Sequence, residues 1–349
     1  MPTQSPIRIG ALVPLSRPGW VEAGRQLLAG LATGVDEVNR AGGGPFELVV
    51  RDTAADPQRA SAAVEELAAL GVVALAGEYH SVVARAAAAR ARALELPFLC
   101  SSAVLDAIVD EPTPWVARLA PPQSRGWALY AEFLLAAGHR RIAVVTQASA
   151  YWQAGARILR KAFAPAGGTV IELDVPTLAP DELLAGSATA LLLLVGHPEP
   201  AVSIVRAARA DPRLKDVLVG APAGQPELAD WVAALGRAGA GVPFLRYLPP
   251  NPDLRVDVAL RAHLGGPPSF VAFEGYDTIA VLTELVRGHG TDRSAIAAGW
   301  SSVAVEGSRG RITLARVPGI DVWQWPAAPI QVVERDPSAL ERIRVLRSS

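Results

Sequence analysis

Short apolar runs alternate with stretches of helical periodicity along the first hundred residues. Between the runs, apolar residues recur every three or four positions: Leu27, Leu31 and Val35, for example, share one helical face. That helix is expected to end at the glycine turn 42–44. The expected strands are Ile7–Val13, Phe46–Arg51, Val72–Ala76 and Pro97–Cys100. Alternation of strand and helix is typical of a parallel sheet that helices cover on both faces.

A second alternating series follows Pro121 and Pro122, and the end of the chain is rich in strand patterns. We expect a helix over Tyr276–Arg287. A chain of 349 residues exceeds what one hydrophobic core usually supports, so we expect two lobes. The strands expected here are Ile142–Thr146, Val170–Leu173, Ala190–Val195, Val217–Gly220, Gly241–Tyr247, Arg311–Leu314, Asp321–Trp325 and Ile330–Val333.

Charge, cysteine content and the lengths of the apolar runs exclude several classes of function. The net charge is -1 and no block of like charges occurs, so the sequence lacks the basic surface of a nucleic-acid binder. The single cysteine, Cys100, excludes an internal disulfide and lies in an apolar run, where we expect a buried, inert thiol. The apolar run Ala190–Val195 is too short to span a membrane.

The segment Met1–Pro6 lacks the pattern of a signal peptide. Two expectations for the compartment therefore stay open. Either the chain acts in the cytoplasm, or it acts outside the cytoplasm, in the periplasm or at the cell surface, after removal of an export signal.

Seven segments, in chain order, carry a resemblance to a known family. The first resembles a first strand with its ligand loop, and the fifth resembles the start of the second lobe. They are IRIGALVPLSRPGW (7–20), GVDEVNRAGGGPFELVVRDTAADPQRA (34–60), ALGVVALAGEYHSVVARAAA (69–88), LELPFLCSSA (94–103), AYWQAGARILRKAF (150–163), GYDTIAVLTELV (275–286) and GSRGRITLA (307–315). Together they resemble the type I periplasmic binding proteins, in the branch that binds branched-chain amino acids such as leucine, isoleucine and valine, or amides.

The resemblance implies an α/β fold of two Rossmann-like lobes joined by three crossovers, with the ligand cleft between the lobes. By analogy, the crossovers lie near Arg118–Gln123, Tyr247–Asp253 and Gly307–Arg311. The implied first lobe is 1–120 plus 250–306, and the implied second lobe is 121–249 plus 307–349.

Loops at the carboxyl ends of the strands are the expected ligand site, because strand ends and helix N-termini meet there. Ser81 and Ser102 precede expected helices, so each hydroxyl can cap its helix or donate to a ligand oxygen. The family resemblance favours the ligand role, and aromatic residues in these loops would supply apolar walls. The residues expected to contact the ligand are Trp20, Tyr79, His80, Ser81, Ser101, Ser102, Ala103, Tyr151, Trp152, His197, Glu274 and Tyr276.

One position departs from the family pattern. Amino-acid-binding members carry an acidic residue after the strand that matches Val217–Gly220, where it pairs with the ligand's ammonium group, and Pro222 stands here instead. Glu227 is expected to cap a helix, whereas Glu274 or Asp277 would have to replace the missing acid. The departure favours an amide, an aromatic acid or another uncharged small molecule over a branched-chain amino acid.

The functional expectation is a binding protein that is not an enzyme. The chain has no nucleophile elbow, no phosphate-binding glycine loop and no histidine pair at metal-ligand spacing, so we expect no cofactor and no metal. The leading interpretation is the solute-binding protein of an ABC importer, with permease subunits as partners and no membrane insertion of its own. A cytoplasmic sensor of amide-type ligands with the same fold is the alternative, and an enzyme on an α/β fold is a minor one.

Overall fold

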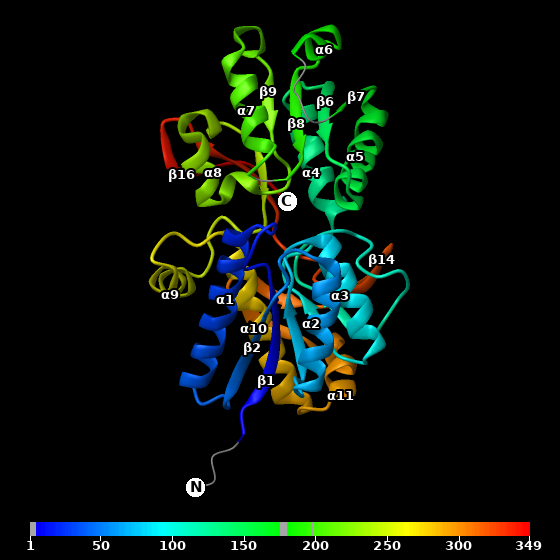
Figure 1. The fold of residues 1–349 in the computed structure, drawn as a ribbon, viewed down its shortest axis with the longest axis vertical. Coiled ribbons are helices and arrows are strands. Elements are labelled where there is room, and N and C mark those ends of the chain that lie inside the picture. The colour runs from blue at the N-terminus through cyan, green and yellow to red at the C-terminus, as the bar shows by residue number, and fades with distance from the viewer. Residues whose placement is uncertain (1–4, 175–179, 197) are drawn as a thin grey trace. The chain divides into compact units, whose positions relative to one another are not determined.

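The chain forms two compact units in a computed structural model that describes residues 5–174, 180–196 and 198–349 (Figure 1). The first unit comprises the described residues of Met1–Pro122 together with Tyr247–Pro329. The second comprises those of Gln123–Arg246 with Ile330–Ser349. Each unit is built around its own sheet.

A seven-stranded sheet forms the centre of the first unit, in the order β13-β14-β5-β4-β3-β1-β2. All neighbours from β14 to β2 pair in parallel, and only β13 runs antiparallel to its neighbour. Parallel pairing brings the carboxyl ends of these strands to one edge. The strands are β1 Ile7–Val13, β2 Phe46–Asp52, β3 Ala74–Gly77, β4 Phe98–Cys100, β5 Val116–Arg118, β13 Ala315–Val317 and β14 Ile320–Gln324.

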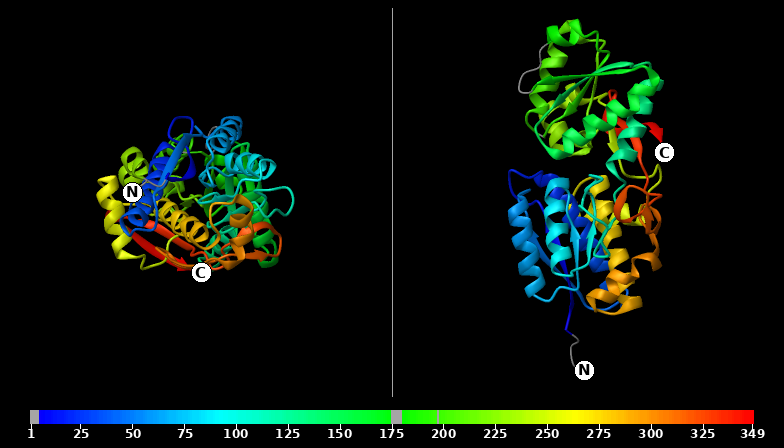
Figure 2. Two further views of the ribbon diagram at one scale, coloured as in Figure 1. Left: turned by 90° about the horizontal axis from the view of Figure 1, so that it is seen from below. Right: turned by 90° about the vertical axis from the view of Figure 1, so that its right-hand side faces the viewer.

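Helices cover both faces of this sheet, as the right-hand view of Figure 2 shows. Helices α2 (Pro57–Ala69) and α3 (Ser81–Ala93) bury their apolar sides in one core cluster on one face. Helices α1 (Val21–Arg40) and α10 (Phe270–His289) pack against each other. Gly30 permits this contact, because a Cβ atom there would lie 2.0 Å from the carbonyl oxygen of Ala272. The unit also contains α9 (Leu254–Leu264), α11 (Arg293–Ala298), and the strand pair β11 (Ala304–Gly307) and β12 (Gly310–Thr313).

The second unit has a four-stranded parallel sheet in the order β7-β6-β8-β9. A separate antiparallel sheet has the order β10-β15-β16 and uses the last twenty residues of the chain. The strands of the second unit are β6 Arg141–Thr146, β7 Thr169–Asp174, β8 Ala190–Leu194, β9 Leu218–Gly220, β10 Phe244–Arg246, β15 Gln331–Asp336 and β16 Ala339–Ser348. Its helices are α4 Gln123–Ala136, α5 Ala150–Phe163, α6 Pro180–Ala185, α7 Ala201–Ala210 and α8 Ala229–Leu235.

The structure confirms the expected α/β class and corrects the expected third crossover. Residues 307–329 belong to the first unit, and the chain leaves it at 329–330 instead of near Gly307–Arg311. The reason is strand β14, which pairs with β5 through Trp323 opposite Ala117 and Gln324 opposite Arg118. The apolar pattern does not predict β5.

Candidate ligand-binding site

Three loops of the first unit leave the carboxyl edge of its sheet from the neighbouring strands β1, β3 and β4. They are 14–20, 78–80 and 101–105. Half of the residues expected to bind a ligand lie in these loops. Ligands of open α/β sheets bind at this edge, so it is the candidate site.

Three aromatic rings from two of these loops form a cluster. The ring centroids of Trp20 and Tyr79 lie 5.5 Å apart, and those of Tyr79 and His80 lie 5.3 Å apart. The Trp20 and His80 rings meet edge to face at 6.0 Å. Trp20 and Tyr79 are both partly exposed, so each can offer ring surface to a ligand.

His80 holds the two loops together. Its Nδ1 atom lies 3.3 Å from the Glu78 carboxylate, and its Nε2 atom lies 3.4 Å from the backbone nitrogen of Trp20. A carboxylate accepts and an amide donates, so Nδ1 carries the proton and Nε2 accepts. Glu78 is fully buried and also accepts hydrogen bonds from Thr53 Oγ1 and the Tyr79 amide. Both ring nitrogens of His80 are therefore used within the protein, which gives it a positioning role.

Ser81 also binds a neighbouring loop. Helix α3 begins at Ser81 after His80 in the N-cap position, so the serine side chain does not cap the helix. Its Oγ instead accepts from the backbone amides of Val104 and Leu105, each at 3.2 Å. These two bonds hold the loop that follows β4.

The two serines after β4 differ in their surroundings. Ser101 is fully buried, and its Oγ accepts from the Gly77 amide at 3.1 Å and from Thr278 Oγ1 at 2.8 Å. Ser102 Oγ is also buried but forms no hydrogen bond with any residue that the structure describes. A buried hydroxyl without a partner costs free energy, so Ser102 is the better candidate for a ligand contact. Ala103, next in the chain, is fully buried.

Cys100, at the end of β4, is buried as expected. Burial raises the pKa of its thiol to about 12, although the charge of Arg118 acts in the opposite direction. The thiol therefore stays protonated at neutral pH, which makes it unreactive.

The acidic residues of α10 lie in a buried ion cluster. Asp277 accepts from Arg309 Nε at 2.7 Å and from Ser308 Oγ at 2.8 Å, and Glu274 Oε1 lies 3.3 Å from Arg309 Nη1. All three ionised side chains are fully buried. Both acids are thus engaged with Arg309, so we do not carry Glu274 forward as a ligand contact. Tyr276 donates from its hydroxyl to Glu37 of α1 at 2.9 Å, and burial raises its pKa.

An aromatic cluster lies at the start of α5 in the second unit. Ser149 caps this helix, with its Oγ accepting from the Trp152 amide at 3.1 Å. The ring centroids of Tyr151 and Trp152 lie 4.6 Å apart, and Trp127 of α4 lies 6.0 Å from Tyr151. The sequence pattern did not identify Trp127, because it lies within a helix. Gly155 of α5 faces the Trp127 ring, and this glycine within an expected helix was the sequence feature that could have indicated the contact. His197 lies outside the described residues.

The loop after β9 carries no acid at the position where the family pattern predicts one. Pro222 is buried there. Glu227 follows in a short 3-10 helix, and its Oε1 accepts from Arg246 Nε at 2.9 Å. The nearest acidic residue of this loop is therefore already paired with an arginine.

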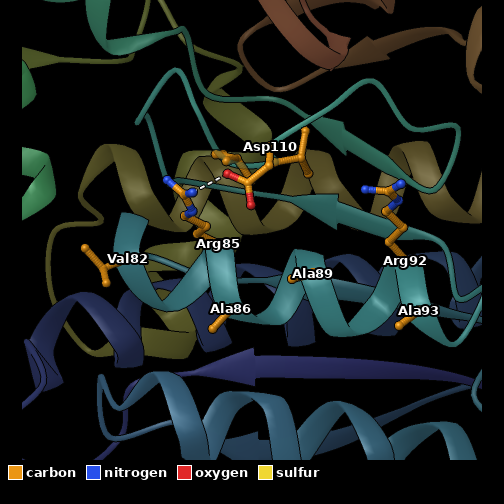
Figure 3. Close-up of a pocket in the computed structure, with 9 residues that line it drawn as sticks. Val82, Arg85, Ala86, Ala89, Arg92, Ala93 and Asp110 are labelled. Carbon is orange, nitrogen blue, oxygen red and sulfur yellow. Dashed lines mark hydrogen bonds and ion pairs between the residues drawn. The ribbon is translucent and has the colours of Figure 1, made fainter.

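A groove of about 500 Å³ lies apart from this edge, on the outer surface of α3 (Figure 3). Alanines of α3 form its floor, and Arg85 forms an ion pair with Asp110 across it. Both charged side chains are well exposed. The groove therefore presents small apolar side chains and a solvated ion pair, and it lacks the buried polar groups that fix a small ligand.

Comparison with known proteins identifies the family. A family model described as "Periplasmic binding protein" matches residues 6–319. This chain is a member of that family. The family consists of non-enzymatic solute-binding proteins, so this periplasmic binding protein is not an enzyme. A search of curated proteins found no match.

Solved structures match this periplasmic binding protein along nearly its whole length. The leucine binding protein LivK of Thermotoga maritima is 20% identical, with a TM-score of 0.84 and 98% of both chains covered. The branched-chain amino acid transporter substrate binding protein LivJ of Streptococcus pneumoniae, in complex with isoleucine, is 18% identical, with a TM-score of 0.82 and coverage of 99% and 100%. A solute-binding protein of R. palustris in complex with benzoate is 20% identical, with a TM-score of 0.78 and coverage of 95% and 93%.

Structural similarity at 18–20% sequence identity establishes the fold of this chain and does not identify its ligand. They confirm the expected type I architecture, with two parallel sheets flanked by helices. None of the helices in the described part of the chain combines the length and apolarity needed to cross a membrane.

Proposed function

We propose that this periplasmic binding protein captures a small organic molecule of the amino acid, amide or aromatic acid class at the carboxyl edge of its first unit. The observation that carries the proposal is Ser102, whose buried hydroxyl has no partner among the described residues. Its loop leaves the same edge of the sheet as the loops that hold Trp20 and Tyr79. A donor at the same edge as an apolar wall suits a ligand with a polar head and an apolar body.

The proposed contacts divide between the ligand's two ends. Ser102 and the backbone of Ala103 would bind the polar head, while Trp20 and Tyr79 would cover the apolar body. His80 and Ser81 would act indirectly, because each binds the loops that carry these groups. Their hydrogen bonds fix the loops before a ligand arrives, which lowers the entropic cost of binding.

We extend the proposal to the second unit through Tyr151 and Trp152. Trp152 is nearly buried within its aromatic cluster, whereas Tyr151 is partly exposed. Hinge closure on the ligand would bring these rings to it, and a ligand that binds the closed form better shifts the protein toward that form.

Delivery to an ABC importer, outside the cytoplasm, completes the proposal. It is supported by family membership and by the solved relatives, one of which is described as a branched-chain amino acid transporter substrate-binding protein. A cytoplasmic sensor of the same fold would bind a ligand equally well. Uptake of the identified ligand by cells with and without the gene distinguishes the two roles. Uptake requires the protein if it is an importer component and does not require it if it is a sensor.

Calorimetry with a panel of leucine, isoleucine, benzoate and benzamide tests the binding step. Binding to the native state also raises the unfolding midpoint as ligand concentration increases, which gives an independent measurement. With a bound member of the panel, Trp20→Ala and Ser102→Ala should each weaken affinity by about 1–3 kcal/mol, the range for a lost stacking or hydrogen-bond contact.

The matched control is Ser61→Ala on α2, where the serine hydroxyl donates to the Pro57 carbonyl oxygen of its own helix. This variant should bind the ligand as the parent protein does. Unchanged affinity in both Trp20→Ala and Ser102→Ala would remove the carboxyl edge of the first unit as the binding site.

A further inference from the structure

Trp20 is the last residue of the loop 14–20, and the structure fixes this loop at both ends. At its far end, His80 connects the Trp20 amide to the buried Glu78 carboxylate. A second carboxylate lies at its near end, that of Asp52, the last residue of the neighbouring strand β2. Asp52 has no role in the proposed function so far, so its partners decide what it contributes.

Both oxygens of the Asp52 carboxylate bind groups around the start of this loop. Oδ1 accepts from the backbone amides of Leu15 at 2.8 Å, Ser16 at 3.2 Å and Ala54 at 2.9 Å. Oδ2 accepts from Ser16 Oγ at 2.6 Å and from Arg59 Nη2 at 3.1 Å. One side chain therefore joins the first residues of the loop 14–20 to the loop that follows β2.

The Asp52 carboxylate is ionised at neutral pH. Burial acts to raise its pKa, but this effect is outweighed by hydrogen bonds from Ser16 Oγ and from the Ala54 and Leu15 amides. The charge of Arg59 lowers the pKa further, so it lies below its usual value. Hydrogen bonds to an ionised acceptor are stronger than those to a neutral one. The loop is therefore bound by the stronger form of this acceptor.

The loop that follows β2 has a strained backbone where it meets the loop 14–20. Ala54 and Ala55 have φ angles of 48° and 58°, in the left-handed region that residues with a side chain disfavour. The Ala54 amide is held by Asp52, and a Cβ atom at Gly19 would lie only 3.3 Å from the Ala55 Cβ atom. Strain of this kind persists where surrounding contacts fix it, and it is concentrated at binding sites.

We propose that Asp52 is a positioning residue for ligand binding, which holds the loop 14–20 in the conformation that presents the Trp20 ring. This inference rests on the proposed function and assigns a role in it to a strand end outside the expected ligand loops. Asp52 already accepts five hydrogen bonds, whereas a carboxylate has about four lone-pair sites. Its effect on a ligand therefore passes through the loop.

A positioning residue and a contact residue affect binding kinetics differently. Loss of a direct contact mainly speeds dissociation. Loss of pre-ordering lowers the fraction of protein that is competent to bind, and the apparent affinity falls by the same fraction. We therefore expect Asp52→Ala to slow association about tenfold with little change in dissociation, whereas Trp20→Ala should speed dissociation.

Hydrogen exchange tests the support of the loop without any ligand. In Asp52→Ala the amides of Leu15 and Ser16 lose their acceptor, so peptides spanning 14–20 should exchange at least about tenfold faster in mass spectrometry. Asp52→Asn keeps Oδ1 as an acceptor and loses the charge, so its exchange should lie between those of the parent protein and Asp52→Ala. The asparagine variant also keeps the test available if the alanine variant does not fold.

Stopped-flow binding tests the link to the ligand. The probe is whichever of leucine, isoleucine, benzoate and benzamide binds the parent protein. Association should slow in the same order as exchange accelerates, with Asp52→Asn between the parent protein and Asp52→Ala.

The matched control is Asp56→Ala, which removes a carboxylate four residues further along the same loop. Asp56 is the N-cap of α2 and accepts from the Arg59 amide at 2.8 Å. Its loss should lower the unfolding midpoint, because a helix cap is removed. Exchange of the segment 14–20 and the association rate should stay as in the parent protein.

The outcomes separate this inference from the proposed function. Exchange of the segment 14–20 that stays slow in Asp52→Ala would overturn the inference with or without a ligand. Faster exchange with an unchanged association rate would also overturn it, as would equal slowing of association in Asp56→Ala. Unchanged affinity in both Trp20→Ala and Ser102→Ala would instead overturn the proposed site, and with it the ligand role of Asp52, even where exchange shows that the loop is loosened.

Discussion

The two aromatic clusters of this protein are held in place by different forces. In the first unit, Trp20 and Tyr79 are positioned by hydrogen bonds, because His80 connects the Trp20 amide to the buried Glu78 carboxylate. In the second unit, Trp152 and Trp127 are held by packing, and a Cβ atom at Gly155 would lie only 2.1 Å from the Trp127 ring. The position of the first cluster depends on hydrogen-bond partners. The packing of the second cluster depends on glycine at position 155, where a Cβ atom would meet the Trp127 ring.

The difference matters for ligand recognition. Hydrogen-bonded loops can place a ring at a fixed position while leaving its face partly exposed, as Trp20 and Tyr79 are. A packed cluster buries its rings, so Trp152 is only 6% exposed. We therefore expect substitutions of buried polar groups to be most damaging in the first unit, and changes of volume to be most damaging in the second.

The largest effect is expected for Asp277→Asn, which removes one charge of the buried cluster in the first unit. Arg309 would keep its charge without its closest charged partner, and the single amide oxygen could accept from Ser308 or from Arg309 but not from both. Breaking a buried pair in this way costs about 3–5 kcal/mol. Urea unfolding measures the loss. Glu306→Gln breaks an exposed pair with Arg311 and should cost less than about 1 kcal/mol; similar values for the two variants would contradict the importance of burial.

A smaller effect is expected for Gly155→Ala in the second unit. The added methyl group must displace the Trp127 ring, and overpacking of this kind costs about 1–3 kcal/mol. Gly288→Ala is the opposite case, because this glycine of α10 has no atom within 4 Å of an added Cβ, and alanine favours a helix by about 0.5–1 kcal/mol. Thermal unfolding should move in opposite directions for the two variants; a stabilised Gly155→Ala would show that the Trp127 ring moves without cost.

The smallest of the three effects is expected for His80→Phe. The ring is retained, but the Trp20 amide loses its acceptor and Glu78 loses a donor, at a cost of about 1–2 kcal/mol in the free energy of unfolding. Binding of any identified ligand should weaken as well, since the Trp20 loop is released. The control is His263→Phe on the exposed surface of α9, which should be close to neutral. Unchanged stability and affinity in His80→Phe would mean that ring packing alone holds the cluster.

Much of the fold follows from local patterns. Strand β1 has the predicted bounds, and α10 contains the predicted helix Tyr276–Arg287. The patterns predicted β14 as Asp321–Trp325, within one residue of its bounds, but did not predict its neighbour β5. The family resemblance implied a third crossover about twenty residues before the boundary at 329–330.

The sequence pointed to loops for the candidate site and did not resolve the state of individual residues. The rule that ligands bind at strand ends selected the loops of Trp20, Tyr79 and Ser102 from sequence alone. It could not distinguish Ser101, which is bonded to Thr278, from Ser102, which has no partner among the described residues.

Sequence by itself determined the order of strands and helices, the family and the edge at which a ligand is expected. These properties depend on periodicity and on residues that are neighbours in the chain. Only the tertiary structure decided which polar groups are already engaged: Arg118 binds Gln324, 206 positions away, and Ser101 binds Thr278, 177 positions away. Hydrogen-bond partners of buried groups come from distant segments, so the donors that remain for a ligand become visible only after the chain has folded.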